Sequence, residues 1–265
     1  YIVRSIVLGL VGATLAFAHP TDVGVGRPAD LAELRQEKLA FVQYRVARVT
    51  DELASAQALA LAARHFDVPC EIVVPRGAPV TKIEACRGYG AVVVEHGAAL
   101  KEAVDEALAR AGATGMTFCP PFDDPAVVAG QGTLGIELVE DVDGLTTVVV
   151  PLGGGGLASG VAIAVKSLLP DARVIGVQAA VCAPYAGGSV PDGAVLTLAD
   201  GIAVKYPGEV TAPLVEHWVD DIVTVTEDQI AEAMVLLMER AKLYVEGAGA
   251  VAVAALMSGA VAPDP

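Results

Sequence analysis

Apolar residues along the chain follow two alternating patterns, one typical of buried strands and one typical of helices. The short apolar runs that predict strands are 70–75, 91–96, 117–120, 146–152, 172–179 and 221–226. The segments whose spacing predicts helices are 53–65, 79–88, 99–112, 127–140, 157–168, 228–245 and 248–258. Gly112 is expected to end the helix over 99–112, and Thr226 to cap the helix over 228–245.

The alternation of strands and helices predicts βαβ units, and therefore an α/β protein with parallel sheets covered on both faces. Residues 180–210 are rich in Gly and Pro and are expected to form a loop. A length of 265 residues fits one large domain or two lobes. Hydrophobic residues make up 54% of the chain and aromatic residues only 5%, so we expect a core of Ala, Val and Leu.

The net charge of −15 limits the possible partners. An acidic surface repels the phosphates of nucleic acids and anionic lipids, which argues against nucleic-acid and membrane binding. The four cysteines, at positions 70, 86, 119 and 182, form no CxxC pair and have no spacing typical of a metal site. We interpret them as small buried side chains in a reducing cytoplasm, and we expect no metal.

The first residues resemble a signal peptide, because Arg4 precedes an apolar run that ends in A-x-A at Ala16–Ala18. The apolar core of this run is short for a membrane span. The chain also begins at Tyr1 rather than Met. We favour an apolar helix and turn packed on the domain over secretion, and hence a cytoplasmic protein.

The stretch VVVPLGGGGLASG, residues 148–160, places four glycines between a buried strand and a helix. Glycines allow the backbone to approach an anion closely, and the N-terminus of the following helix adds a partial positive charge. No GxxxxGK[ST] motif is present, and the spacing does not fit GxGxxG. An anion site is therefore the favoured interpretation, and a tight turn without a ligand is the alternative.

Five segments together resemble the serine/threonine dehydratase (threonine ammonia-lyase) family of fold-type II pyridoxal 5′-phosphate (PLP) enzymes. They are APVTKIEACRGYGA (78–91), PFDDPAVVAGQGTLGIEL (121–138), VVVPLGGGGLASG (148–160), LADGIAVKYPGEVT (198–211) and VEGAGAVAVAAL (245–256). The resemblance implies a two-lobed, tryptophan synthase β-like architecture with parallel sheets. The implied large cofactor-binding lobe is 1–42 plus 129–265, and the implied small lobe is 43–128.

The same resemblance implies the chemistry. The family deaminates threonine or serine to a 2-keto acid and ammonia, with PLP as the electron sink. Gly153, Gly154, Gly155, Gly156 and the adjoining Leu157 would bind the cofactor phosphate. Gly201 and Glu246 would lie beside the cofactor ring. A homodimer and a small amino acid substrate are also implied.

Several family landmarks are replaced. The family lysine that forms an imine with PLP aligns with Arg45, whose guanidinium stays protonated and cannot form one. The S-x-G-N-H loop that binds the substrate carboxylate is replaced by residues around Asp51, and the family's final strand and turn are absent. Lys38, Lys82 and Lys205 are weak candidates for a substitute amine. The alternative function is therefore a non-catalytic relative that binds PLP or phosphate without an internal imine.

Overall fold

The structure, a computed structural model, describes residues 53–98, 100–188, 190–191, 193 and 195–262. The chain divides into two compact units, and the division in sequence lies between Val127 and Val128. The predicted lobe boundaries, 1–42 plus 129–265 and 43–128, stay a prediction. The apolar N-terminal segment and its predicted helix and turn lie outside the described residues.

The described residues of the smaller unit form two parallel strands and three helices. In chain order these are α3 (Leu53–His65), β1 (Glu71–Val74), α4 (Val80–Gly88), β2 (Val92–Glu95) and α5 (Leu100–Thr114). Glu71 pairs with Val92 and Val74 with Glu95, so the two strands run in register over their full length. The parallel pairing confirms the βαβ unit that the apolar pattern predicts.

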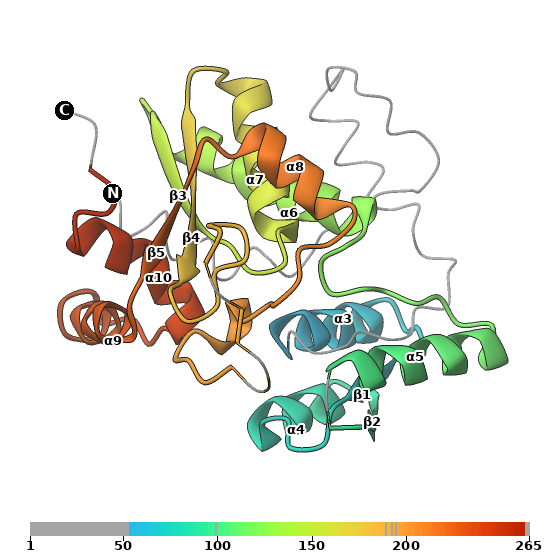
Figure 1. Ribbon diagram of the computed structural model, residues 1–265. Helices are drawn as coiled ribbons and strands as arrows, with labels where there is room; N and C mark the ends of the chain where they lie inside the picture. The colour runs from blue at the N-terminus through green and yellow to red at the C-terminus, as the bar shows by residue number, and fades with distance from the viewer. Residues whose placement is uncertain (1–52, 99, 189, 192, 194, 263–265) are drawn as a thin grey trace. The chain divides into compact units, whose positions relative to one another are not determined.

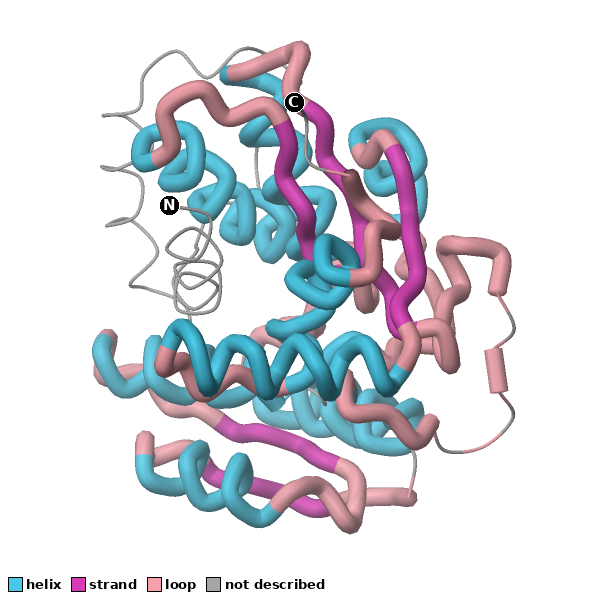
Figure 2. Tube along the Cα trace, turned by 90° about the vertical axis from the view of Figure 1, so that its left-hand side faces the viewer, coloured by secondary structure: helices cyan, strands magenta, loops and turns pink. Residues whose placement is uncertain are grey.

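Alternate side chains of β1 contact helices on opposite faces of the pair. Ile72 and Val74 pack in one cluster with α3 and α4, and Val73 packs against Ala103 and Ala107 of α5. Figure 2 shows the two strands of this unit lying between helices. Successive strand residues point to opposite faces, so a run that is apolar throughout is what a doubly covered sheet requires.

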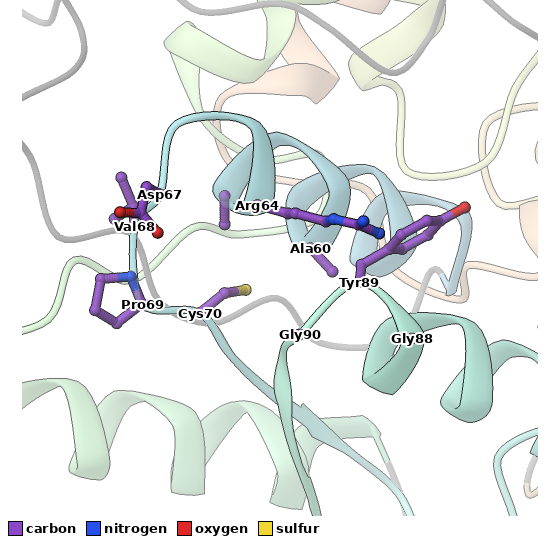
Figure 3. A pocket seen from close by; sticks show the side chains of 10 residues that line it. Ala60, Arg64, Asp67, Val68, Pro69, Cys70, Gly88, Tyr89 and Gly90 are labelled. Atoms are coloured by element: carbon purple, nitrogen blue, oxygen red, sulfur yellow. The ribbon is translucent and has the colours of Figure 1, made fainter.

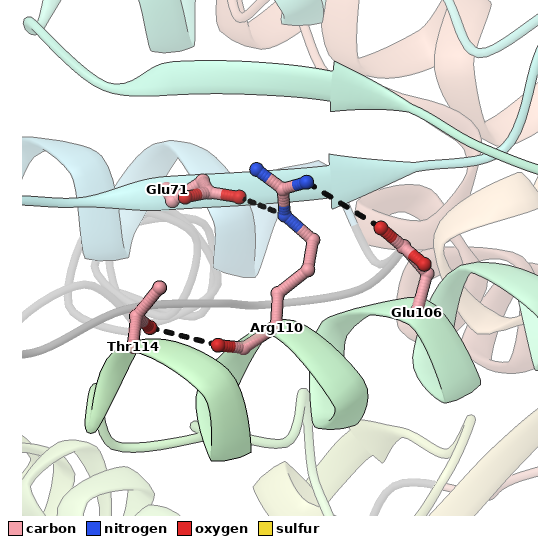
Figure 4. A network of polar contacts seen from close by, with 4 residues as sticks. All are labelled: Glu71, Glu106, Arg110 and Thr114. Carbon is pink, nitrogen blue, oxygen red and sulfur yellow. Dashed lines mark hydrogen bonds and ion pairs between the residues drawn. The ribbon is translucent and has the colours of Figure 1, made fainter.

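An ion-pair network holds α5 to the start of β1 (Figure 4). The Arg110 guanidinium donates from Nε to Glu71 and from Nη1 to Glu106, the latter over 3.4 Å. The Thr114 hydroxyl donates to the Arg110 carbonyl oxygen over 2.8 Å. This network fixes the last turns of α5 against the sheet.

The larger unit contains a three-stranded parallel sheet in the order β3–β4–β5. Val150 of β3 pairs with Gly176 of β4, which pairs with Ile222 of β5. The elements are α6 (Pro125–Asp141), β3 (Thr147–Pro151), α7 (Gly156–Leu168), β4 (Arg173–Ala179), η2 (Asp200–Ile202), α8 (Thr211–Trp218), β5 (Asp221–Val225), α9 (Glu227–Leu236), η3 (Leu237–Ala241) and α10 (Gly247–Met257).

Helices cover both faces of this sheet. Val174 packs in a cluster with α6, α7 and α8, while Ile175 and Val177 pack in another with α9 and α10. Figure 1 shows these two sets of helices on opposite sides of β3, β4 and β5. Helices α6 and α7 approach closely, since a methyl group built on Gly160 would lie 2.3 Å from the Val128 carbonyl oxygen.

Three sequence predictions are wrong in detail. The strand predicted over 117–120 is only a single-residue bridge at Thr117, and the chain then continues into two prolines that have no N–H to donate. Helix α5 continues through Gly112 to Thr114, and Gly115, with φ of 69°, follows its end. The remaining predicted strands and helices are present, with small shifts at their ends.

The third error concerns the helix predicted over 228–245. Thr226 caps α9 as predicted, in a capping box with Gln229, but α9 ends at Leu236 and a single π-helical turn follows. Lys242 then adopts φ of 59°, and residues 242–246 form neither helix nor strand. Leu243 and Val245 both pack on the core, and residues two apart lie on different faces of a helix, so this pair does not fit a continued helix.

Within the part of the chain that is described, no helix combines the length and the apolar character needed to cross a membrane.

Candidate functional site

The four glycines form the connection between β3 and α7, at the carboxyl end of the three-stranded sheet. In open α/β sheets ligands bind at this end. Gly153 to Gly156 are all buried, and Gly156 is the first residue of α7. Gly155 caps the helix with φ of 98°, a conformation that favours glycine. Leu157, in the first turn of α7, is half-buried.

Side chains from two other segments pack against one side of this loop. A methyl group built on Gly155 would lie 2.7 Å from the Tyr185 hydroxyl oxygen, 3.0 Å from Thr211 Cβ and 3.1 Å from Val215 Cγ2. Thr211 and Val215 belong to α8, and Tyr185 lies in the loop after β4. Position 155 is therefore closed on this side to any side chain.

The same side chains hydrogen-bond to the loop backbone. The buried Thr211 hydroxyl donates to the Gly154 carbonyl oxygen over 2.6 Å, and the Tyr185 hydroxyl donates to the same oxygen over 3.1 Å. The two hydroxyl oxygens lie 3.5 Å apart. The Gly154 carbonyl is thus satisfied by two donors from outside the glycine segment.

The buried side-chain amide of Gln178, on β4, hydrogen-bonds to two segments next to the loop. The Gln178 side chain is fully buried, and its Nε2 donates to the Leu152 carbonyl oxygen over 3.2 Å. Its Oε1 accepts from the backbone N–H groups of Tyr185 and Ala186, at 3.0 and 3.1 Å. One side chain therefore joins the start of the glycine loop to the segment that carries Tyr185.

The loop after β4 has a further attachment at Cys182. Its thiol donates to the Val204 carbonyl oxygen over 3.6 Å. Burial raises the pKa of this thiol, and the nearby Lys205 partly opposes the rise. The group is therefore a neutral packing element rather than a nucleophile.

The structure brings together Gly201 and Glu246, which the sequence singles out separately. Gly201 lies in η2, and Glu246 is the N-cap residue of α10. A methyl group on Gly201 would lie 3.7 Å from Glu246 Oε1 and 3.2 Å from Ala248 Cβ. Close to Gly201 in sequence, the Leu198 N–H donates to the carboxylate of Glu227, the first residue of α9, over 2.7 Å.

A buried hydroxyl on α7 lies near the loop. Ser159, on α7, is fully buried, and its Oγ has no hydrogen-bond partner in the part of the chain that the structure describes. Buried hydroxyls normally form a hydrogen bond, so one without a protein partner is expected to bind a ligand or a water molecule. Its backbone N–H donates to the Gly155 carbonyl oxygen over 2.9 Å, which ties it to the glycine loop.

Only two of the three candidates for a substitute amine, Lys82 and Lys205, are among the described residues. Arg45 and Lys38 lie outside the described residues, and so does Asp51. Lys82 is half-buried in α4 of the smaller unit. The Lys205 ammonium donates to the Gly193 carbonyl oxygen of its own loop. Among the described residues, no group of three His, Cys, Asp or Glu side chains is arranged to hold a metal ion.

Sequence reasoning missed three of the residues around the glycine loop: Gln178 as a network centre, Tyr185 and Thr211. Helix α8 itself was not expected, although Pro213 in its first turn is a typical start signal.

The smaller unit has a cavity of about 470 Å³ beside the α4–β2 turn. It is lined by residues of α3, the start of β1 and the turn itself, with Arg64 and Tyr89 as its large side chains (Figure 3). None of the residues predicted to bind cofactor lines it. Burial raises the pKa of the Cys70 thiol at its wall to about 12, with smaller contributions from Cys119 and Cys86, so this thiol stays protonated.

Comparison with known proteins identifies relatives along most of the described chain. L-threonine ammonia-lyase of Thermotoga maritima is 48% identical over 208 residues, which are 77% of this chain and 52% of that protein. The catabolic L-threonine dehydratase of Escherichia coli K12 is 43% identical over 209 residues, 77% of this chain and 64% of the relative. The chain thus spans about half to under two thirds of the length of these relatives.

Solved structures agree on the fold. The crystal structure of a threonine deaminase from T.th. superimposes with a TM-score of 0.75 at 36% identity, covering 82% of this chain and 74% of that one. The architecture is accordingly that of the fold-type II PLP enzymes, as the five motifs imply. The model of the pyridoxal-phosphate dependent enzyme family matches residues 54–264, and the chain therefore belongs to that family.

Proposed function

We propose that the protein is a PLP-dependent ammonia-lyase that converts L-threonine or L-serine to a 2-keto acid and ammonia. The observation that carries the proposal is the buried tetraglycine connection at Gly153–Gly156, braced on one side and followed by a helix N-terminus. The similarity to threonine ammonia-lyases at 43–48% identity supports the substrate class. The comparisons give no support to a non-catalytic alternative.

The residues present fit the phosphate of the cofactor. Side chains fill one side of Gly155, so the small volume of glycine is needed there in addition to its positive φ. The orphaned Ser159 hydroxyl is a further donor near the first turn of α7. Backbone N–H groups at the start of a helix bind phosphate through hydrogen bonds and the helix dipole.

Each element of the site has a proposed task. The glycine loop would bind the phosphate, and Gly201 would allow close approach of the cofactor ring beside Glu246. When bound, PLP supplies an electron sink for the pair left after the α-proton is removed. The substrate would then lose its β-hydroxyl, and water would hydrolyse the released enamine to the 2-keto acid and ammonia. The chain's residues orient the reacting groups for these steps.

The test is an assay of the full chain loaded with PLP. We expect 2-oxobutanoate from L-threonine and pyruvate from L-serine, measured by the oxidation of NADH in a coupled reduction of the keto acid. Gly155→Ala, in the glycine loop, should lose the activity, and its matched control Gly90→Ala, at the turn of the smaller unit, should keep it. Bound PLP without keto acid from either substrate would contradict the proposal and support the non-catalytic alternative.

We extend the proposal to a homodimer in the cytoplasm. The larger unit exposes Leu196 and Tyr244 at 94% and 97%, and large apolar side chains of this kind are often covered in an assembly. All four cysteines are free thiols, which supports a reducing compartment. Sedimentation velocity of the purified chain would contradict the dimer if only a monomer is observed at micromolar concentration.

A further inference from the structure

We propose that Gln178, Tyr185 and Thr211 form a clamp that orients the N–H groups of the glycine loop toward the cofactor phosphate. The clamp residues would not touch the cofactor. They act through the backbone, so they are positioning residues. The inference rests on the proposed role of the glycine loop as the phosphate site.

The argument starts from the geometry of one peptide unit. In a planar trans peptide the C=O and the following N–H point in opposite directions. The Gly154 carbonyl oxygen accepts hydrogen bonds from Thr211 and Tyr185, so it points toward them. The N–H of Gly155 must therefore point away from both hydroxyls, to the other side of the loop.

The same reasoning applies two residues earlier. The Leu152 carbonyl oxygen accepts from Gln178 Nε2, so the Gly153 N–H points away from Gln178. Gln178 Oε1 also accepts from the Tyr185 N–H and thereby holds the segment that carries the Tyr185 hydroxyl. Two of the four glycine N–H groups are thus directed by side chains from elsewhere in the unit.

Hydrogen bonds that restrict the loop conformation matter most where the backbone is glycine. A glycine segment has more accessible conformations than any other, and an unbraced loop would lose that freedom on binding the phosphate. Gln178 and Thr211 are fully buried, so their hydrogen bonds are not exchanged for water. The loop would therefore be ordered before the ligand arrives, which improves affinity without adding a contact.

Two measurements on the full chain test the clamp, with Thr211→Val as the main variant. Valine keeps the shape of threonine and removes the hydroxyl that donates to Gly154. The first measurement is amide hydrogen exchange of peptides covering residues 152–157 without ligand. The second is the dissociation constant for PLP, from quenching of Trp218, the single tryptophan.

We expect Thr211→Val to speed exchange in the glycine loop at least tenfold and to weaken PLP binding at least tenfold. Thr211→Ser, which restores the hydroxyl, should return both values to within about threefold of the wild type. Exchange elsewhere in the large unit, in α9 for example, should stay unchanged, which separates the clamp from general destabilisation.

Loop exchange in Thr211→Val as slow as in the wild type would overturn the clamp. Failure of serine to rescue would overturn it too, because the methyl group rather than the hydroxyl would then matter. If the wild type itself binds no PLP, the proposed function fails, and the exchange comparison still decides whether the clamp orders the loop.

Discussion

Two turns of the molecule use nearly the same backbone conformation for different purposes. Gly155, in the β3–α7 turn of the larger unit, has φ of 98°, and Gly90, in the α4–β2 turn of the smaller unit, has φ of 93°. A methyl group on Gly90 would meet no atom within 4 Å, whereas one on Gly155 would meet three side chains at 2.7–3.1 Å. At position 90 glycine is needed only for the positive φ of the turn. At position 155 it is also needed because neighbouring side chains leave no space for a Cβ atom.

The side chains around the two turns differ in the same way. Gly90 and Tyr89 border an open cavity, while Gly155 is backed by a fully buried threonine and a hydrogen-bonded tyrosine. A positive φ by itself therefore says little about function. We propose that the polar side chains packed around the buried glycine loop, rather than the positive φ, mark it as a binding turn.

The largest expected difference follows from Gly155→Ala and Gly90→Ala. Left-handed backbone costs alanine about 1–2 kcal/mol at either position. Overpacking adds about 1–3 kcal/mol at position 155 alone. We expect Gly155→Ala to lower the free energy of unfolding by roughly 2–5 kcal/mol and to abolish PLP binding, as measured by urea denaturation and ligand titration. Equal losses for the two variants would remove the contrast between the turns.

Gln178→Glu tests the amide at the centre of the clamp. The carboxylate can still accept from Tyr185 N–H, but it places a second oxygen against the Leu152 carbonyl in a fully buried position. We expect a loss of roughly 2–4 kcal/mol in unfolding free energy, because the substitution replaces the Nε2 donor by a buried, charged carboxylate oxygen.

The control is Gln229→Glu in the capping box of α9, where glutamate can accept the same N–H of Thr226. Its unfolding free energy should change by only a few tenths of a kcal/mol. A Gln178→Glu variant as stable as this control would show that the Leu152 hydrogen bond has no energetic weight.

The smallest effect is expected from a pair of hydroxyl deletions, Tyr185→Phe and Tyr89→Phe. Tyr185→Phe removes one of two donors to the Gly154 carbonyl and should cost about 1 kcal/mol. Tyr89 borders the open cavity, and its phenylalanine variant should be nearly neutral. The unfolding temperatures of both variants and the wild type, measured side by side, give the two losses of stability. A larger loss in Tyr89→Phe than in Tyr185→Phe would contradict the expected order.

Much of the fold was predictable because it depends on local patterns. Apolar runs and helical spacing located β3, β4 and β5 and the helix α7 between β3 and β4, since a doubly covered parallel sheet favours apolar residues on both faces of a strand. The end of α9 was not predictable, because residues 237–245 contain no Gly or Pro. Packing of Leu243 and Val245 on the core, rather than local propensity, ends that helix.

In the candidate site too, local features were predictable from the sequence and tertiary contacts were not. Four consecutive glycines between a predicted strand and a predicted helix located the β3–α7 loop from the sequence, and the role of Gly153–Gly156 as a phosphate site stays a prediction. Thr211 and Tyr185 lie 57 and 31 residues away from the carbonyl that they bind. No periodicity links them to the loop, because only the tertiary packing of α8 and the segment after β4 brings them together.

The most direct test of the central claim compares PLP with pyridoxal, which keeps the ring and the aldehyde but lacks the phosphate. Adventitious reaction with surface lysines would affect both ligands equally. Isothermal titration of the unliganded full chain should give at least about a hundredfold tighter binding of PLP than of pyridoxal, since charge-assisted hydrogen bonds to the phosphate supply the difference. Equal affinities would contradict the assignment of Gly153–Gly156 as the phosphate site.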